Sequence, residues 1–222
     1  MTIGILMAAG KSTRTKTSIP KQFHKICDRP VLFYSLTTFE RSQLVDLCLL
    51  MVPQEWKATA EQMICDFKKV KWVLPGGNTR HETSLIAVDF VRNLKPSLVV
   101  FHDAARPFLS LKLLETVIEE AKTFGAATAA IPVADSVAYC EDGFLSSYAS
   151  RESLYRIQTP QAFQYEIIDD AIRKFQADDG SKPVFLMGKQ IRVVEGDPYC
   201  FKITTSKDLQ LAQQICQFWK ED

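Results

Sequence analysis

The stretch MAAGKSTRTKTSIPKQF, residues 7–23, combines one glycine with several cationic and hydroxyl side chains and contains no Asp or Glu. Backbone amides beside Gly10 and cations such as Arg14 and Lys21 suit the oxygens of a phosphate group. The glycine spacing matches neither the P-loop of nucleotide hydrolases nor the G-x-G-x-x-G fingerprint. A basic surface loop without a ligand and a phosphate site flanked by two cations therefore both remain open.

A second candidate loop contains Gly76 and Gly77, followed by Arg80. One interpretation is a flexible connection before a helix that begins near Thr83, with Thr83 or Ser84 as its cap. The other is a loop whose small residues let a nucleotide base approach the backbone. The sequence does not decide between these two interpretations.

The third candidate loop is HDAARP, which follows an apolar run and ends at a proline. Asp103 suits sugar hydroxyls or a metal, and Arg106 suits a bidentate contact with a phosphate. The alternative is an internal salt bridge that shapes the loop. We expect His102 to be a packed core histidine and not a catalytic base.

Signals nearer the C-terminus are weaker when taken one at a time. Arg151, the stretch IQTPQAF at 157–163 and the stretch FKITTSKDL at 201–209 add cations and hydroxyls. Arg151 is equally explained as a solvated side chain, and Thr205 or Ser206 as the cap of the last helix.

Short apolar runs alternate with helical patterns, which predicts an α/β fold with a doubly wound, mostly parallel sheet. Strands are expected at Ile3–Ala8, Leu47–Val52, Lys71–Leu74, Leu98–Phe101 and Ala126–Val133. Helices are expected at Val31–Arg41, Glu55–Phe67, Thr83–Leu94 and Leu111–Phe124. Ligands of such sheets bind outside the carboxyl ends of the strands, so the three candidate loops are expected to meet at one edge.

The alternation lapses after Val133. Ser136–Cys140 and Phe144–Ala149 flank an Asp-Gly pair, which favours a hairpin turn. An isolated hairpin is marginal in water, so we predict that residues 135–156 form a projecting arm that contacts a second subunit. The tail is expected to contain helices at Tyr165–Phe175 and Lys207–Trp219 and strands at Gln190–Val194 and Cys200–Thr204.

The bulk composition excludes several classes of protein. A chain of 222 residues with 46% hydrophobic side chains can bury one substantial core, and a net charge of +1 argues against coating nucleic acid or an acidic membrane. No run approaches the roughly 20 apolar residues of a membrane span, so the cytoplasm is expected. The six cysteines lack the spacing of a zinc or dithiol motif and are expected to be reduced, mostly buried thiols.

The order of the motifs adds information that none of them has alone. MAAGKSTR…PKQF, PGGNTRHETS, HDAARP, PVADS, RESLYRIQTPQAF and KITTSKDL together resemble the 2-C-methyl-D-erythritol 4-phosphate cytidylyltransferases over nearly the whole chain. The resemblance implies transfer of CMP from CTP to 2-C-methyl-D-erythritol 4-phosphate in non-mevalonate isoprenoid biosynthesis. The products are 4-diphosphocytidyl-2-C-methyl-D-erythritol and pyrophosphate. It also implies one Rossmann-like nucleotidyltransferase domain over residues 1–222 and a homodimer formed through the arm.

The resemblance assigns roles to the residues at matching positions. Arg14 and Lys21 resemble the pair that stabilises the charge on the α-phosphate during displacement. The cytidine-binding surface is matched by residues of the first two loops, namely Ala8, Ala9, Gly10, Gly77 and Thr83.

Positions further along match the rest of the site. Contacts with the ribose or the second substrate are matched by Asp103, Ala104 and Arg106. Lys202 resembles a ligand for the CTP phosphates or the incoming phosphate, with Thr159 nearby. Ser136 and Arg151 are expected to reach the methylerythritol phosphate from the arm of the partner subunit, and Arg151 and Lys202 join Arg14 and Lys21 as catalytic cations.

The implied chemistry needs no general base, because a phosphate monoester is already anionic at neutral pH. Mg²⁺ on the triphosphate, with Arg and Lys around the reacting phosphorus, supplies the electrostatic stabilisation. No side chain is assigned as a metal ligand, and Mg²⁺ is expected to be held mainly by the CTP phosphates. The expected partners are CTP, a sugar-alcohol phosphate and a second subunit, without nucleic acid or membrane.

Several positions depart from the family pattern. Ser12, Thr83 and Ser136 keep small size or a hydroxyl, whereas Cys200 stands where an asparagine is usual and removes hydrogen-bonding capacity beside Lys202. Asp178 and Asp179 fit either a site-supporting or a surface role. Two other functions are considered: a ribitol 5-phosphate cytidylyltransferase, which has similar chemistry, and a non-catalytic nucleotide-binding protein, for which Cys200 is the reason.

Overall fold

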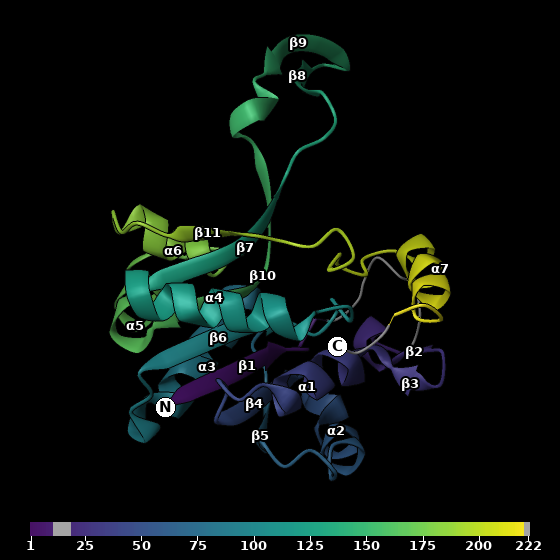
Figure 1. Ribbon diagram of the computed structural model, residues 1–222, viewed down its shortest axis with the longest axis vertical. Helices are drawn as coiled ribbons and strands as arrows, with labels where there is room; N and C mark the ends of the chain where they lie inside the picture. The colour runs from purple at the N-terminus through teal and green to yellow at the C-terminus, as the bar shows by residue number, and fades with distance from the viewer. Residues whose placement is uncertain (11–18, 220–222) are drawn as a thin grey trace.

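The computed structural model describes residues 1–10 and 19–219, and its centre is a seven-stranded sheet (Figure 1). The strand order is β11-β7-β10-β6-β1-β4-β5. All neighbouring strands are parallel except β10, which runs antiparallel to both β6 and β7. The bounds are β1 Thr2–Met7, β4 Leu47–Val52, β5 Val70–Pro75, β6 Leu98–Asp103, β7 Ala126–Pro132, β10 Tyr155–Gln164 and β11 Arg192–Glu195. The mostly parallel α/β sheet and its five expected strands are confirmed.

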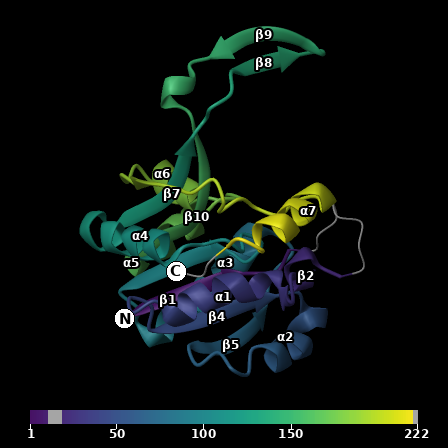
Figure 2. The same cartoon turned by 45° about the vertical axis from the view of Figure 1, so that its right-hand side comes forward.

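Helices cover both faces of this sheet, as expected for a doubly wound fold (Figures 1 and 2). One core cluster joins α1, α2 and α4 to side chains such as Leu6 and Leu50. A second cluster joins α3, α5 and α6 to side chains such as Ile5 and Leu49 on the opposite face. The helix bounds are α1 Val31–Arg41, α2 Lys57–Met63, α3 Arg80–Val91, α4 Leu111–Phe124, α5 Tyr165–Lys174, α6 Ser181–Leu186 and α7 Ser206–Ile215. Short 3₁₀ turns are η1 Lys21–Phe23, η2 Gln54–Trp56, η3 Arg92–Leu94 and η4 Arg151–Ser153.

The strand β10 was not predicted, because its middle is polar and contains Pro160. Gln158 and Gln161 are nevertheless buried, and the amide nitrogen of each is hydrogen-bonded: Gln158 Nε2 donates to the carbonyl of Asp197 over 2.8 Å, and Gln161 Nε2 donates to Asp179 Oδ2 over 2.8 Å. The pairing of β10 with β7 shifts between Ile157 and Gln161, which accommodates the proline. Hydrogen bonds to residues distant in the sequence therefore stabilise the buried polar side chains of a strand that lacks the usual apolar pattern.

The arm is a β-hairpin of β8 Val137–Glu141 and β9 Phe144–Ala149 that projects away from the sheet (Figures 1 and 2). Its turn has positive φ at Asp142 (50°) and Gly143 (86°), the conformation that an Asp-Gly pair favours. The expected hairpin is confirmed, although its first strand begins one residue later than predicted.

Two expectations about local structure are wrong. Residues Cys200–Thr204 are not a strand; they form an irregular segment in which Ile203 N donates to Ala105 O over 2.8 Å. The cap of α3 is Thr79, whose hydroxyl accepts from Glu82 N over 3.0 Å, and neither Thr83 nor Ser84 has this role. The predicted cap of the last helix at Thr205 is confirmed, and its side chain accepts from Asp208 N.

The expectation of six reduced thiols is also wrong. Cys27 and Cys216 are joined by a disulfide. Cys27 lies in the turn between the short strands β2 Lys25–Ile26 and β3 Arg29–Pro30, and Cys216 follows α7. Sequence spacing could not show this pair, because it is brought together by the packing of α7 against β2. Of the four free cysteines, Cys48 and Cys200 are buried, whereas Cys65 and Cys140 are exposed.

Candidate active site

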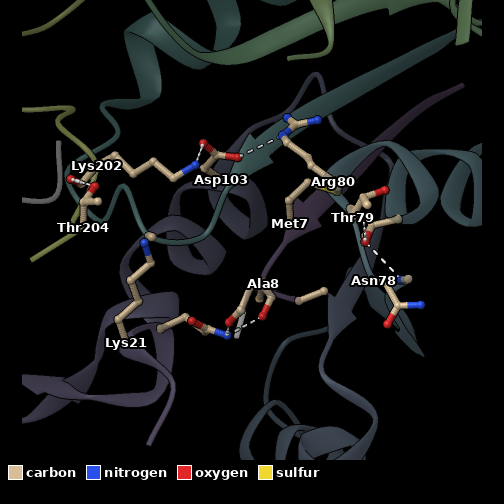
Figure 3. A pocket seen from close by; sticks show the side chains of 15 residues that line it. Met7, Ala8, Lys21, Asn78, Thr79, Arg80, Asp103, Lys202 and Thr204 are labelled. Atoms are coloured by element: carbon tan, nitrogen blue, oxygen red, sulfur yellow. Dashed lines mark hydrogen bonds and ion pairs between the residues drawn. The ribbon is translucent and has the colours of Figure 1, made fainter. Parts of the chain in front are cut away.

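A pocket of about 400 Å³ lies at the carboxyl ends of β1, β5 and β6 (Figure 3). Its walls come from five segments that are far apart in the sequence, which confirms that the polar loops meet at one edge of the sheet. The lining residues are Met7, Ala8, Ala9, Gly10, Lys21, Gln22, Gly77, Asn78, Thr79, Arg80, Thr83, Asp103, Ala105, Lys202 and Thr204.

The first wall is the turn that leaves β1. Ala8 N donates to Met51 O over 2.8 Å, which continues the sheet bonding by one residue. Gln22, buried in η1, donates from Nε2 to the carbonyl of Ala8 and, over 3.2 Å, to that of Gly10. One buried amide thus fixes the backbone of the small-residue turn and leaves its surface open to a ligand.

The second wall is the glycine loop before α3. A side chain at Gly76 would overlap Ala9, and one at Gly77 would overlap Glu82, so both positions need glycine for close packing. Thr83 Oγ1 accepts from Gly77 N over 3.1 Å and donates to Thr79 O over 2.8 Å. The loop is therefore braced by its own helix and is not a flexible connection, and it contributes Gly77, Asn78, Thr79, Arg80 and Thr83 to the pocket surface.

The third wall carries the carboxylate of Asp103, which lies among three cations; Figure 3 shows two of them, Lys202 and Arg80. Oδ2 is 2.8 Å from Lys202 Nζ and 3.7 Å from Arg106 Nε, and Oδ1 is 3.6 Å from Arg80 Nε. Burial opposes ionisation of Asp103, but the nearby charges of Lys202, Arg80 and Arg106 outweigh it and lower the pKa of Asp103 well below its ordinary value. The group is an anion at neutral pH.

The charges around the pocket favour an anionic guest. Among its described lining residues, Lys21, Arg80 and Lys202 are cations and Asp103 is the single carboxylate, so three positive charges and one negative leave an excess of two. Figure 3 shows Lys21 and Lys202 reaching toward the pocket from η1 and from the segment before α7. The Nη2 atom of Arg80 is buried and has no hydrogen-bond partner among the described residues.

Comparison with known proteins agrees with this geometry. A family model described as 2-C-methyl-D-erythritol 4-phosphate cytidylyltransferase matches residues 2–217. The enzyme of that name from Thermotoga neapolitana is 39% identical over 222 residues, covering 99% of each chain. The chain belongs to the 2-C-methyl-D-erythritol 4-phosphate cytidylyltransferase family.

Solved structures support the same assignment. The 4-diphosphocytidyl-2C-methyl-D-erythritol synthase from Anaerococcus prevotii superimposes with a TM-score of 0.85 at 25% identity, covering 97% of this chain and 96% of that one. The 2-C-methyl-D-erythritol 4-phosphate cytidylyltransferase from Thermus thermophilus gives 0.80 at 28% identity, covering 96% and 98%. The family membership thus rests on sequence and fold together.

The described residues that the family resemblance selected fall into three groups in space. Those at the pocket are Ala8, Ala9, Gly10, Lys21, Gly77, Thr83, Asp103 and Lys202. Ala104, Arg106 and Thr159 do not line it: Ala104 and Thr159 are buried, and Arg106 donates from Nη1 to Cys200 O over 2.8 Å. Ser136 and Arg151 are exposed residues of the arm and are not among the residues that line the pocket. Arg14 lies outside the described residues.

The internal salt bridge considered for HDAARP is present, whereas contacts of Asp103 and Arg106 with a ligand stay a prediction. Asp103 pairs with Arg106 inside the loop and also lines the pocket. His102 is fully buried, as expected for a core histidine, and burial lowers its pKa to about 4. A neutral, enclosed imidazole has no access to substrate, so the prediction that it is not a catalytic base is consistent with its position.

Cys200, the departure from the family pattern, does not line the pocket. Its side chain is fully buried, its Sγ donates to Thr159 O over 3.4 Å, and burial raises the pKa of the thiol to about 12. The backbone carbonyl of Cys200 holds Arg106, which any residue at this position could do. Its substitution for asparagine therefore gives little support to a protein without turnover. Asp179 accepts from Gln161 and from the start of α6, a supporting role within the fold.

Sequence reasoning missed several pocket residues. Gln22 lies inside the PKQF motif and Arg80 inside PGGNTR, but neither was selected, because both types are common on surfaces. Asn78 and Thr204 line the pocket, and their sequence neighbours gave only weak signals. Asn78 directly follows Gly77 at a strand end, and this proximity could have indicated it, whereas Gln22 has no neighbouring glycine and gave no such signal.

Proposed function

We propose that this protein transfers CMP from CTP to 2-C-methyl-D-erythritol 4-phosphate, forming 4-diphosphocytidyl-2-C-methyl-D-erythritol and releasing pyrophosphate. One observation carries the proposal: a strand-end pocket lined by a small-residue turn, by the cations Lys21, Arg80 and Lys202, and by Asp103, which is paired with Lys202. Small residues admit a base and ribose close to the backbone, and the positive excess matches a triphosphate and a phosphate monoester. Family membership supplies the identity of the two substrates.

In the proposed reaction, an oxygen of the methylerythritol phosphate attacks the α-phosphorus of CTP in line with the departing pyrophosphate. The attacking group is already anionic, so no residue has to remove a proton. Lys21 and Lys202 stabilise the charge that develops on the transferring phosphoryl group, and we assign Arg14 to the same task. Removal of one such cation commonly slows phosphoryl transfer by ~10²-fold or more.

The pocket fits Mg²⁺ that arrives with the nucleotide. The described residues contain no group of three or more His, Cys, Asp or Glu side chains that could hold a metal by themselves. Mg²⁺ at phosphate sites typically needs few protein carboxylates beside the phosphate oxygens, so a pocket in which Asp103 is the single carboxylate among the described lining residues fits an ion held mainly by the CTP phosphates. When bound, the ion neutralises the triphosphate charge and favours departure of pyrophosphate.

We propose that two chains form a homodimer through the arm, residues 135–156. Large hydrophobic side chains on the hairpin are mostly exposed, with Tyr139 64%, Phe144 78% and Tyr148 71% accessible to solvent. Such a cluster on an isolated hairpin favours burial against a partner. In this assembly Ser136 and Arg151 approach the partner's pocket and contact the methylerythritol phosphate.

None of the helices described within residues 1–10 and 19–219 is long and apolar enough to cross a bilayer. We propose a cytoplasmic location, where CTP is made. A disulfide such as Cys27–Cys216 is unusual in the cytoplasm of organisms other than hyperthermophiles. Cell fractionation tests the proposed location, and trapping of free thiols in the same fractions tests whether the disulfide is formed there.

The activity is tested by measuring pyrophosphate release with CTP, Mg²⁺ and methylerythritol phosphate. Lys202→Ala and Lys21→Ala are expected to lose at least about 10²-fold in kcat, whereas Lys112→Ala, an exposed lysine on α4, is the matched control. Ribitol 5-phosphate serves as the competing substrate, and equal or greater kcat/KM with it would reject the proposed specificity. Calorimetric binding of CTP without turnover would reject enzymatic function.

A further inference from the structure

His102 connects β6, which ends at Asp103, to the neighbouring strand β10. It is the penultimate residue of β6, and Thr159 lies on the neighbouring strand β10; both side chains are buried. Thr159 Oγ1 is 3.1 Å from His102 Nδ1 and 3.0 Å from the backbone nitrogen of Asp103. His102 Nε2 is 3.1 Å from the backbone oxygen of Arg106. The imidazole therefore touches both ends of the turn from Asp103 to Arg106, directly at one end and through Thr159 at the other.

The partners of His102 assign its protons. The amide of Asp103 can only donate, so Thr159 Oγ1 accepts there and its single proton is left for Nδ1 of His102. The carbonyl of Arg106 can only accept, so Nε2 must carry the other proton. The geometry thus requires a proton on Nε2, and full burial among neutral hydrogen-bond partners favours the neutral imidazole, whose Nδ1 accepts from Thr159.

This chain of hydrogen bonds fixes the backbone that carries the pocket carboxylate. The turn is closed by a bond from Arg106 N to Asp103 O over 2.9 Å. From it the Asp103 carboxylate extends to Lys202 at 2.8 Å and toward Arg80 at 3.6 Å. Because cations attract Asp103 from several directions, the position of its backbone decides which of them it holds.

We propose that His102 is a positioning residue for cytidylyl transfer, acting through Thr159 and the Arg106 carbonyl to hold Asp103, and through it Lys202, in the reactive arrangement. The inference rests on the proposed function. His102 and Thr159 touch no substrate in this scheme, since neither lines the pocket. Their contribution is to limit the movement of a charged loop, and loss of fixed geometry at the reacting centre lowers the rate of transfer.

The first test is the proton state of His102. Nitrogen-15 NMR of histidine-labelled protein at pH 7, with the His102 signal identified by its absence from His102→Gln, should show the neutral, Nε2-protonated tautomer. An imidazolium, or a neutral ring protonated on Nδ1, would overturn the proposal. This measurement needs no turnover and no variant of Thr159.

The second test is kinetic and uses matched variants of Thr159. Thr159→Val keeps the shape but leaves the buried Asp103 amide and His102 Nδ1 without their partner, and about a 10-fold or greater fall in kcat per CTP-binding site is expected. Thr159→Ser restores the hydroxyl and should recover kcat to within about threefold. Thr128→Val, at another buried threonine, on β7, is the control and should behave as wild type.

These outcomes separate a positioning role from a structural one and from failure of the proposed activity. The number of CTP-binding sites, counted by calorimetry, corrects kcat for any loss of folded protein. If the role of Thr159 is purely structural, kcat per site is unchanged in Thr159→Val, and that result would overturn the inference. If Thr159→Val does not fold, the tautomer measurement decides by itself. Absence of pyrophosphate release from the wild-type protein would instead reject the proposed function, whatever tautomer His102 has.

Discussion

Lys202 Nζ lies 2.8 Å from Oδ2 of Asp103, and this ion pair joins the segment before α7 to the end of β6. Asp103 is almost fully buried, whereas the Lys202 side chain is 38% exposed. The lysine is therefore oriented from one side by a fixed carboxylate while its other side remains open to the pocket. A cation held in this way needs little reorganisation when a phosphate enters.

Substitution of Lys202 by arginine tests whether charge alone is sufficient. Lys202→Arg keeps the positive charge but replaces the compact ammonium 2.8 Å from Asp103 by a larger, planar guanidinium, which places the charge differently in the pocket. We expect kcat to fall by about 10-fold, less than the ~10²-fold expected for alanine. Steady-state kinetics on the two variants checks this order, and an arginine variant as fast as wild type would show that geometry at Lys202 is unimportant.

Asp103→Asn removes the anion that compensates Arg80, Arg106 and Lys202. The pKa of Asp103 is lowered in the folded state, so its ionised form stabilises the fold above the unfolded-state pKa of about 3.8, and this contribution declines as the pH falls below that value. The variant should therefore be less stable than wild type at pH 6, with a smaller difference at pH 3. Urea unfolding at both pH values measures it; a difference that grows in acid would contradict the assignment.

Removal of the Cys27–Cys216 disulfide should destabilise the protein. Cys216→Ser is expected to lower the free energy of unfolding by about 2–5 kcal/mol, because the bond closes a long loop between β2–β3 and the end of α7. Cys65→Ser, at an exposed free thiol, is the control. Chemical denaturation with and without reductant provides the measurement. Four reactive thiols in denatured, unreduced protein are expected, and six would show that the bond is absent.

The arm prediction concerns assembly and not stability of the sheet. A double substitution of Phe144 and Tyr148 by serine on β9 removes two of its most exposed hydrophobic side chains, and we expect the dimer to dissociate at concentrations where wild type remains dimeric. The temperature at which the seven-stranded sheet unfolds should change little, because both side chains lie on the arm and neither belongs to the core of the sheet. Sedimentation equilibrium checks the mass, and an unchanged mass would place the interface elsewhere.

The same dissociation should reduce activity if Ser136 and Arg151 act on the partner's pocket. Arg151 is held near the base of the arm by a bond from Nη1 to Ala134 O over 3.1 Å. Mixing Arg151→Ala with Lys202→Ala subunits is expected to restore activity above that of either variant, because one of the two mixed sites then contains both wild-type residues. No recovery in the mixture would indicate that each pocket uses residues of its own chain.

The sequence alone determined the strands that are buried on both faces and the hairpin turn. Continuous apolar runs such as Leu47–Val52 and an Asp-Gly pair between strand-like segments are local signals, and local physical chemistry is enough to interpret them. The motif order likewise indicated the family and most of the residues around the pocket.

Only the tertiary structure decided the features that depend on partners distant in the sequence. The polar strand β10 forms because buried amides such as Gln158 bond to the C-terminal segment, and Cys27 meets Cys216 because α7 packs against β2. The same holds for Asp103, whose cations come from three segments, and for Thr159, which is a buried support and not part of the pocket wall. A hydrogen bond or ion pair forms only between two groups that lie close together, and for residues distant in the sequence that distance is set by the folded structure.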